Sequence, residues 1–290
     1  MSTLHPTSEV RSLLRSATAT LTAAGVASPD FDAAELLAHV LGTTRPQLPL
    51  AAPPSDTQRV TYDALVARRA RREPLQHLTG TAAFRYVELA VGPGVFVPRP
   101  ETEVLAGWGV DRARDVAQTG RTPVVVDLCT GSGAIALALA TEVPQARVHA
   151  VELSDEALAW ATKNLAGSGV DLRQGDMADA FPDLDGTVDV LLCNPPYIPL
   201  EAYESVAPEA RDHDPSLALW SGGDGLDAMR VLERVAARLL RPGGVVGAEH
   251  ADVQGESAPA VFRGHDRWTE VRDHRDLAGR PRHLTARLAR

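Results

Sequence analysis

The sequence predicts an α/β protein, in which a Rossmann-like domain with a mostly parallel sheet follows a small all-helical N-terminal domain. Five apolar segments after residue 123 alternate with helical segments, which is the pattern of a parallel sheet built from βαβ units. A glycine-rich loop directly follows the first apolar segment and is typical of a strand-to-helix turn that approaches a ligand. The first 80 residues show helical periodicity only.

Three amphipathic helices are expected in residues 1–80. The first ends near Gly25, the second begins at Ser28 and closes at Gly42, and the third opens at Asp56. The third helix ends in four arginines, which we interpret either as a solvated helix end that complements the helix dipole or as a docking patch for an acidic or RNA-associated partner. These arginines are Arg68, Arg69, Arg71 and Arg72.

Residues 81–97 are expected to form a β-hairpin linker that turns at Gly92-Pro93-Gly94, and residues 98–290 form the Rossmann-like domain. The expected strands are Val124–Leu128, Arg147–Val151, Val170–Gln174, Val188–Cys193 and Val245–His250, with helices around Ile135–Ala140, Glu156–Asn164 and Leu226–Leu240. Because ligands of such sheets bind at the carboxyl ends of the strands, the motifs at those ends are the candidates for function.

A cofactor loop is expected after the first strand. Its glycines let the backbone turn sharply and approach a ligand closely. The loop also fits the G-x-G-x-x-A pattern of dinucleotide sites, and a tight turn without a ligand is a further interpretation. The candidate cofactor-binding residues here are Asp127, Cys129, Thr130, Gly131, Ser132 and Gly133, and Asn194 after the fourth strand is a further candidate for the cofactor.

Two acidic residues at later strand ends indicate a nucleoside cofactor. Glu152 ends the second strand, where its carboxylate can accept hydrogen bonds from both ribose hydroxyls. Asp176 follows the third strand and is placed to accept from an adenine amino group, with Met177 against the ring. Taken singly, Glu152 also suits the N-terminus of the next helix and Asp176 an ordinary loop turn. Their occurrence with the loop in strand order favours the cofactor.

The charge of Asp127 distinguishes the two adenosine cofactors. A dinucleotide places an anionic pyrophosphate on the loop, whereas S-adenosylmethionine carries a sulfonium cation and an amino-acid tail. Asp127 lies at the strand end just before the glycines, so it suits a cationic ligand and repels a pyrophosphate. S-adenosylmethionine is therefore the expected cofactor, with S-adenosylhomocysteine as its product.

The tetrapeptide Asn194-Pro195-Pro196-Tyr197 after the fourth strand predicts the reaction. An amide or aromatic NH2 group is a poor nucleophile because its lone pair is delocalised, and the barrier to rotation of about 18–20 kcal/mol about a peptide C–N bond shows the extent. The Asn194 side-chain oxygen and the Pro195 carbonyl can accept the two N–H bonds, Pro196 stiffens the turn, and Tyr197 can stack on the flat group. As an isolated motif the tetrapeptide would be only a Pro-Pro turn.

The composition limits the kinds of partner and ligand that we expect. The formal net charge is −9, from 29 Lys and Arg against 38 Asp and Glu, which argues against stable nucleic-acid binding. We expect no signal peptide, no membrane span and hence a cytoplasmic protein. Cys129 and Cys193 lack metal-site spacing, so we expect no metal; they follow neighbouring strands, so we expect two nearby free thiols.

The chain resembles the HemK/PrmC family, the release-factor glutamine methyltransferases, through most of its length. The segments that carry the resemblance are Pro74–Gly80, Phe96–Glu103, Asp127–Gly133, Asn194–Tyr197, Asp214-Pro215, Ala218-Leu219, Gly222–Leu226 and Asp276–Arg280. The resemblance implies a class I S-adenosylmethionine-dependent methyltransferase that methylates the glutamine in the Gly-Gly-Gln motif of peptide chain release factors. It also implies that the helical N-terminal domain helps to bind that substrate protein. Departures are Glu152 for the more usual aspartate, and Cys129 and Ala251 where glycine is common.

Three alternatives stay open at the level of sequence. An adenine amino-methyltransferase would grip a flipped base with the same tetrapeptide. An NAD-dependent oxidoreductase would use the G-x-G-x-x-A pattern but has no use for Asn194–Tyr197. A scaffold could keep the fold without activity. We expect a monomer, and Arg99 and Glu101 are left out of the candidate site because they also suit helix initiation.

Overall fold

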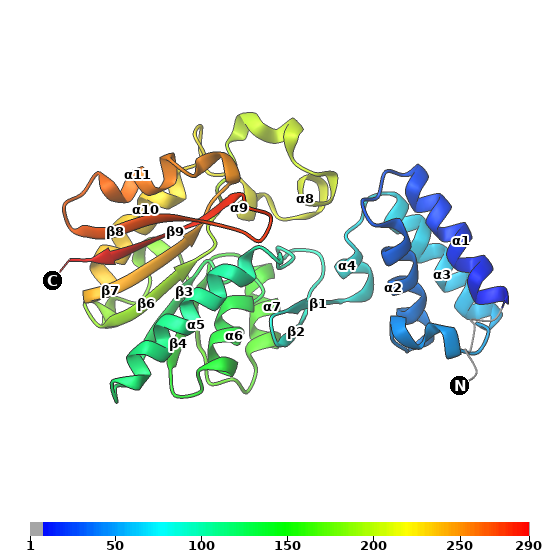
Figure 1. The fold of residues 1–290 in the computed structure, drawn as a ribbon, viewed down its shortest axis with the longest axis horizontal. Helices are drawn as coiled ribbons and strands as arrows, with labels where there is room; N and C mark the ends of the chain where they lie inside the picture. The colour runs from blue at the N-terminus through cyan, green and yellow to red at the C-terminus, as the bar shows by residue number, and fades with distance from the viewer. Residues whose placement is uncertain (1–7, 290) are drawn as a thin grey trace. The chain divides into compact units, whose positions relative to one another are not determined.

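A computed structural model describes residues 8–289 and divides into two compact units (Figure 1). One unit comprises the described chain up to Thr81 together with residues 207–213, and the other comprises residues 82–206 with the chain from Asp214 onward. Among residues 8–289, no helix has the length and apolar character that crossing a bilayer demands.

The smaller unit is helical, and its three main helices start and end where the sequence predicts. Gly42 closes the second helix in the left-handed conformation, with φ of 63°, and Ser55 caps the third by accepting from the Gln58 backbone N–H at 3.3 Å. One apolar core that includes Leu36, Leu37 and Tyr62 joins these helices. The elements are α1 (Ser8–Ala23), α2 (Pro29–Leu41), the 3-10 helix η1 (Arg45–Leu50), α3 (Asp56–Ala70), α4 (Leu75–Thr79) and α8 (Pro208–His213).

The arginines at the end of α3 hold α8 in this unit. Arg69 is buried and donates to Asp32 at 2.7 Å and to Glu209 at 2.9 Å. Arg72 binds the same Glu209 through two hydrogen bonds of 2.7 Å, and Arg68 pairs with Glu73. The interpretation of the whole cluster as a solvated helix end is therefore wrong, because three of the four guanidinium groups are engaged in internal ion pairs.

A seven-stranded sheet of order β5-β4-β3-β6-β7-β9-β8 forms the larger unit. The first five of these strands in space are parallel, as the sequence predicts. Its strands are β3 (Val124–Leu128), β4 (Arg147–Glu152), β5 (Asp171–Gln174), β6 (Val188–Cys193), β7 (Leu240–Glu249), β8 (Trp268–Arg275) and β9 (Pro281–Leu288). Its helices are α5 (Thr102–Gln118), α6 (Ala134–Glu142), α7 (Asp155–Leu165), α9 (Ser216–Leu219), α10 (Asp227–Leu239) and α11 (Ser257–Arg263), with short 3-10 turns η2 (Met177–Asp179), η3 (Pro182–Leu184), η4 (Leu200–Ser205) and η5 (Asp252–Gln254).

Two features of the strands differ from the prediction. The sequence analysis missed β8 and β9, which are antiparallel and end the sheet, because they contain many charged and histidine residues and no apolar run. The hairpin also turns elsewhere. Its strands β1 (Thr81–Phe84) and β2 (Val87–Ala90) turn at Arg85-Tyr86, where Arg85 has φ of 51°. A turn does occur at Pro93-Gly94, as predicted, but it follows β2 and does not close the hairpin.

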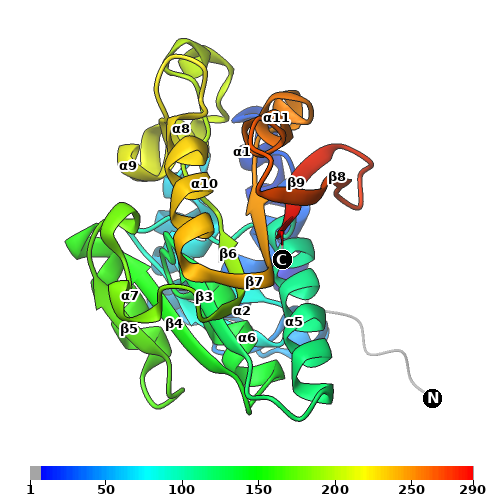
Figure 2. The ribbon, with the colours of Figure 1, turned by 90° about the vertical axis from the view of Figure 1, so that its left-hand side faces the viewer.

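Helices cover both faces of the sheet (Figure 2). Val125 of β3 and Leu192 of β6 face a core shared with α5, α6 and α7. The alternate residues Val126 and Leu191 face a second core shared with α10 and α11. This alternation follows from the two-residue period of a strand. The strand order places the carboxyl ends of β4, β3, β6 and β7 side by side.

Candidate functional site

Four polar side chains lie at or just after the carboxyl ends of neighbouring parallel strands. Asp127 lies near the end of β3, Glu152 ends β4, Asn194 directly follows β6, and Glu249 ends β7. The order β4-β3-β6-β7 makes these strand ends neighbours. The residues that the sequence assigns to the cofactor therefore occupy one part of the edge, and the Asn194–Tyr197 tetrapeptide begins beside them.

The loop after β3 is built from left-handed residues. Cys129, Gly131 and Gly133 have φ of 56°, 58° and 85°, and the Thr130 backbone N–H donates to the Val151 carbonyl of β4 at 3.0 Å. A side chain at Gly133 would come within 3.0 Å of Leu165. The loop thus bends back on the sheet and delivers the N-terminus of α6, as the glycines predict. Ser132 is buried in the loop, and its carbonyl accepts from Asn164 at 2.8 Å.

Asp127 is a fully buried carboxyl group, and only one of its two oxygens accepts hydrogen bonds. Its Oδ2 accepts from the Thr130 hydroxyl at 2.5 Å and from the Ala136 backbone N–H at 3.1 Å. Its Oδ1 is buried and has no hydrogen-bond partner among residues 8–289. Burial raises the pKa of Asp127 to about 7, against the lowering effect of these two hydrogen bonds. A buried acceptor without a donor is costly, so the site fits a cationic ligand that would supply one.

Glu152 is buried, and both of its oxygens accept backbone hydrogen bonds. Oε2 accepts from Gly131 at 2.8 Å, and Oε1 accepts from Leu153 and Ser154 at 2.9 Å each. The carboxylate therefore ties β4 to the cofactor loop as well as to the start of α7. Oε2 keeps a second lone pair for a ribose hydroxyl, whereas Oε1 already accepts two hydrogen bonds.

Asp176 and Met177 lie after β5, as predicted. Asp176 is exposed, and its Oδ1 caps the 3-10 turn η2 by accepting from the Ala178 backbone N–H at 2.9 Å. Met177 contacts Cys129, with the two sulfurs 3.6 Å apart. This contact brings the loop after β5 against the loop after β3, which is the arrangement that a shared adenosine ligand needs.

The tetrapeptide after β6 is held from two sides. Asn194 is half-buried and Pro195 is buried. The Tyr197 hydroxyl donates to Glu249 Oε1 at 3.1 Å, and the Tyr197 carbonyl accepts from Gln254 Nε2 at 3.0 Å. Burial and the nearby Glu249 carboxyl raise the pKa of Tyr197 well above its usual value, so the ring carries a hydroxyl and not a phenolate.

The Gly222–Leu226 block supports this turn. A side chain at Gly225, whose φ is 75°, would come within 2.5 Å of the Tyr197 carbonyl oxygen. The Leu200 N–H donates to the Gly222 carbonyl at 3.1 Å, and Ile198 forms a bridge to Trp220. The glycines of the block thus permit a close approach of two backbones.

Sequence reasoning missed three residues that support the tetrapeptide: Glu249, Gln254 and Thr102. Glu249 is 1% exposed and also accepts from the Thr102 hydroxyl at 2.7 Å. The position of Glu249 at the carboxyl end of a predicted strand was a usable signal. Thr102 and Gln254 gave none, because their partners are far away in the chain.

The two cysteines and Arg99 lie outside the contacts described so far for the tetrapeptide. Cys129 and Cys193 are free thiols in adjacent strand regions, and the prediction is confirmed. Arg99, which the candidate site left out, donates to the fully buried Asp214 carboxylate at 2.7 Å. This ion pair joins the Phe96–Glu103 segment to the segment that begins at Asp214.

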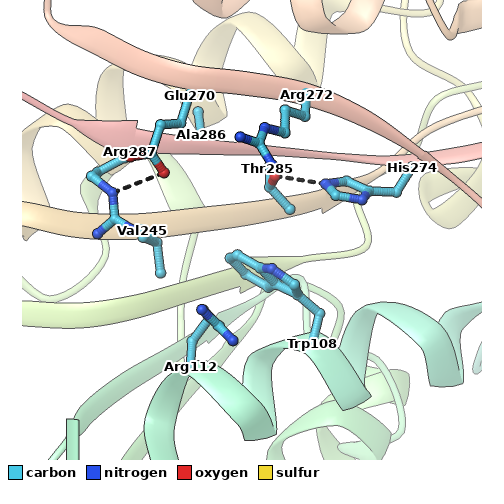
Figure 3. A pocket seen from close by; sticks show the side chains of 9 residues that line it. All are labelled: Trp108, Arg112, Val245, Glu270, Arg272, His274, Thr285, Ala286 and Arg287. Carbon is cyan, nitrogen blue, oxygen red and sulfur yellow. Dashed lines mark hydrogen bonds and ion pairs between the residues drawn. The ribbon is translucent and has the colours of Figure 1, made fainter. Parts of the chain in front are cut away.

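A cavity of about 130 Å³ lies elsewhere, between α5 and the strands β7, β8 and β9 (Figure 3). Trp108 and Arg112 of α5 form one wall, and His274 and Thr285 lie on the opposite one. It contains none of the residues that the sequence assigns to the cofactor or the reaction. Within residues 8–289, no group of three or more acidic, histidine or cysteine side chains is arranged to hold a metal ion.

Comparisons with known proteins identify the family to which this chain belongs. A family model described as "PrmC N-terminal domain" matches residues 12–80, and one described as "Methyltransferase domain" matches residues 125–213. The release factor glutamine methyltransferase of Streptomyces coelicolor is 61% identical over 275 residues, which cover 94% of this chain and 96% of that protein. This chain belongs to the release factor glutamine methyltransferase family. It is accordingly an S-adenosylmethionine-dependent methyltransferase.

Two further relatives are less similar to this chain. The release factor glutamine methyltransferase of Mycolicibacterium smegmatis is 48% identical over 97% of this chain and 99% of its own. A 4-amino-L-phenylalanine/4-methylamino-L-phenylalanine methyltransferase of Streptomyces pristinaespiralis is also 48% identical, over 71% of this chain and 70% of its own. Among solved structures, the hMettl16 catalytic domain in complex with a 3′UTR hairpin has a TM-score of 0.54 at 15% identity and covers 81% of this chain and 82% of its own, which shows the fold alone.

Proposed function

We propose that the protein methylates the side-chain amide nitrogen of the glutamine in the Gly-Gly-Gln motif of peptide chain release factors. The observation that carries the proposal is the Asn194–Tyr197 turn, which follows β6 next to the end of β3, where Asp127 lies. The likeness to release factor glutamine methyltransferases along 94% of the chain supports the substrate.

The tetrapeptide would position a poor nucleophile. The Asn194 side-chain oxygen and the Pro195 carbonyl accept the two N–H bonds of the amide, which holds the nitrogen and stabilises the positive charge that develops on it. Proline at 195 and 196 brings no N–H that would compete for these acceptors. Tyr197 keeps its hydroxyl proton, so its ring offers an uncharged face to the flat amide. Positioning and electrostatic stabilisation therefore promote the transfer without a strong general base. The methylated nitrogen is cationic and strongly acidic, so it then releases one proton to water.

The residues present fit S-adenosylmethionine, which supplies the methyl group as an electrophile on a sulfonium centre. The unpartnered Asp127 Oδ1 would accept from the ammonium group of its amino-acid tail, and the backbone from Cys129 to Gly133 would line that tail. Glu152 would accept from the ribose hydroxyls, with Asp176 and Met177 at the adenine. The helical unit formed by α1 to α4 would bind the release factor.

Methylation of an aromatic amine is the second candidate. The similarity to the 4-amino-L-phenylalanine/4-methylamino-L-phenylalanine methyltransferase favours it, since an aryl NH2 group is also flat and delocalised. That relative covers less of this chain than the release factor enzymes do. The protein substrate therefore remains the primary proposal.

Competition between substrates tests both candidates. The protein is incubated with methyl-labelled S-adenosylmethionine and a release factor, 4-amino-L-phenylalanine or duplex DNA. The proposal expects label in the release factor, and none after its Gly-Gly-Gln glutamine is replaced. Label in the aromatic amine or the DNA but not in the release factor would overturn the protein-substrate proposal.

A further inference from the structure

Glu249 is a buried carboxyl group to which the proposed reaction assigns no role. It ends β7, is 1% exposed, and its two oxygens serve two different hydroxyls. The Tyr197 hydroxyl donates to Oε1 at 3.1 Å, and the Thr102 hydroxyl donates to Oε2 at 2.7 Å. Burial of a carboxyl group is costly unless its lone pairs are satisfied, so this arrangement needs an explanation.

The two hydroxyls fix Glu249, and Glu249 in turn fixes one end of Tyr197. The opposite end of the same residue is fixed by Gln254, which donates to the Tyr197 carbonyl at 3.0 Å. Gln254 is itself buried, and its Oε1 accepts from the Ala251 backbone N–H at 3.0 Å. Backbone and ring hydroxyl of Tyr197 are therefore both anchored by residues from the end of β7 and the turn after it.

We propose that Glu249 is a positioning residue, which holds the Tyr197 ring at the angle where it can lie against the flat NH2-bearing group of the substrate. Glu249 touches neither substrate nor cofactor in this role and acts through the Tyr197 hydroxyl alone. The inference rests on the proposed function for the identity of the substrate, but the contact between Glu249 and Tyr197 is independent of it.

The contact changes with the protonation of Glu249. Burial raises the pKa of Glu249 to about 7, while the Thr102 and Tyr197 hydroxyls and Arg282 lower it and Glu101 raises it. The ionised carboxylate accepts from both hydroxyls, whereas the protonated form carries a donor on one oxygen, so one hydroxyl must turn away. We therefore expect the ring to be held best above pH 7 and less well below it.

Three basic groups near Glu249, namely His283, His250 and Arg282, keep their charge state near pH 7. His283, its partner on β9, has a pKa lowered to about 3 by burial and neighbouring histidines. The next residue, His250, has a pKa lowered by burial. Arg282 keeps its positive charge, because nearby carboxyl groups and Tyr197 raise its pKa against the effect of burial. The transition that Tyr197 itself reports near pH 7 is therefore attributed to Glu249, which bonds its hydroxyl. Asp127, whose pKa is also raised to about 7, bonds Thr130 and Ala136 instead.

The first test observes Tyr197 without any substrate. The chain has four tyrosines, so tyrosine labelled with ¹³C at the ring carbon that bears the hydroxyl gives four resonances, and Tyr197→Phe assigns one of them. We expect the Tyr197 resonance to shift with a midpoint near pH 7 and this shift to vanish in Glu249→Gln. A Tyr197 resonance that is constant between pH 5 and 9 in the wild-type protein would overturn the inference. Because this wild-type result stands alone, the test survives if Glu249→Gln does not fold.

The second test separates positioning from a structural role. With a release factor as substrate at pH 8.5, Glu249→Gln should raise the KM of the release factor about tenfold, the equivalent of one charge-assisted hydrogen bond. At saturating S-adenosylmethionine, whose ammonium group would keep Asp127 ionised, the variant should also flatten the pH dependence of kcat/KM near 7. The Kd of S-adenosylhomocysteine should stay within about twofold. In the Tyr197→Phe background the same substitution should have no further effect on KM.

Glu233→Gln is the matched control, because Glu233 is also a buried glutamate but bonds Arg267 and Trp268. It should lower the melting temperature without changing the KM of the release factor or the pH profile. Equal KM changes in Glu249→Gln and Glu233→Gln, or additive effects of Glu249→Gln and Tyr197→Phe, would refute the positioning role. If the wild-type protein methylates no release factor, the proposed function fails, and the resonance of Tyr197 still decides the inference.

Discussion

The two halves of the carboxyl edge are built in different ways. On the cofactor half, Asp127 bonds residues 3 and 9 positions further along the chain, and Glu152 bonds its next two neighbours and Gly131, 21 positions away. On the reacting half, the contact from Tyr197 to Glu249 spans 52 positions, and that from Gln254 to Tyr197 spans 57. The Thr102 contact to Glu249 spans 147.

This difference implies that the two halves can fail separately. The cofactor half is completed by loops that follow their own strands, so it forms wherever β3 and β4 pair. The reacting half depends on β6, β7 and α5 all being in place. Changes in the reacting half should therefore affect turnover and substrate KM while cofactor binding persists, and changes at Asp127 should do the reverse.

The largest expected effect tests this separation at Asn194. Asn194→Ala removes one of the two acceptors for the amide N–H bonds, and we expect methylation to fall at least about a hundredfold, by analogy with the loss of one preorganised polar group. Isothermal titration with S-adenosylhomocysteine should give a Kd like that of the wild-type protein. Unchanged turnover would refute the role of Asn194, and loss of cofactor binding would break the comparison.

The next effect concerns Asp127. Asp127→Asn removes the charge that the cofactor's ammonium group needs, so the Kd of S-adenosylhomocysteine should rise about 10- to 100-fold. The folded-state pKa of about 7 lies above the ordinary 3.8, so the wild-type protein loses stability as pH rises from 3.8 through 7. Asp127→Asn should thus be more stable above pH 7, by on the order of 4 kcal/mol, as measured by urea unfolding.

The control for this variant is a buried aspartate near the amino end of β6, at the edge of the sheet opposite the candidate site. Asp189 accepts from the Val124 backbone N–H at 3.0 Å and pairs with Arg121. Asp189→Asn should lower stability and leave the cofactor Kd unchanged. A cofactor Kd that is equal for Asp127→Asn and the wild-type protein would contradict the assignment of Asp127.

A smaller effect is expected at Gln254, one of the distant supports of Tyr197. Gln254→Ala leaves the buried Tyr197 and Gly225 carbonyls without this donor, which should cost about 1–3 kcal/mol of stability and raise the substrate KM several-fold. Cofactor affinity should not change. Gln145 is exposed, so Gln145→Ala is the matched control and should change neither quantity.

The smallest effect is expected in the cofactor loop itself. Cys129 has φ of 56°, a left-handed conformation that costs a side-chain-bearing residue about 1 kcal/mol. Cys129→Gly should relieve that strain and raise the free energy of unfolding by about 1 kcal/mol, with cofactor affinity kept. Cys129→Ser retains the strain and so separates it from loss of the thiol. If Cys129→Gly destabilises the protein more than Cys129→Ser, the sulfur contact with Met177 matters more than the backbone.

The same comparison explains how much the sequence could predict. The parallel strands, the loop after β3, Glu152 and the Asn194–Tyr197 turn were predictable because their signals lie within a few residues of one another. Glu249 and Gln254 were not assigned, because only the folded sheet brings them to Tyr197. The partners of Arg69 and Arg72 were missed for the same reason, since Glu209 lies 140 and 137 positions away.

The strands β8 and β9 were missed for a different physical reason. In Trp268–Arg275 only Trp268 is buried, and the buried residues 283–286 of Pro281–Leu288 include His283 and Thr285. Antiparallel strands at the end of a sheet expose much of their surface, so they lack the continuous apolar runs that identified the parallel strands. Asp276 organises the turn between them by accepting from Ala278 and Arg280.

The most direct test of the account is mass spectrometry of a release factor after incubation with the protein and S-adenosylmethionine. Peptide fragmentation should place one methyl group on the glutamine of the Gly-Gly-Gln motif, and Asn194→Ala should leave that glutamine unmodified while still binding S-adenosylhomocysteine. A methyl group on any other residue, or an unmodified release factor alongside a methylated aromatic amine, would contradict the account.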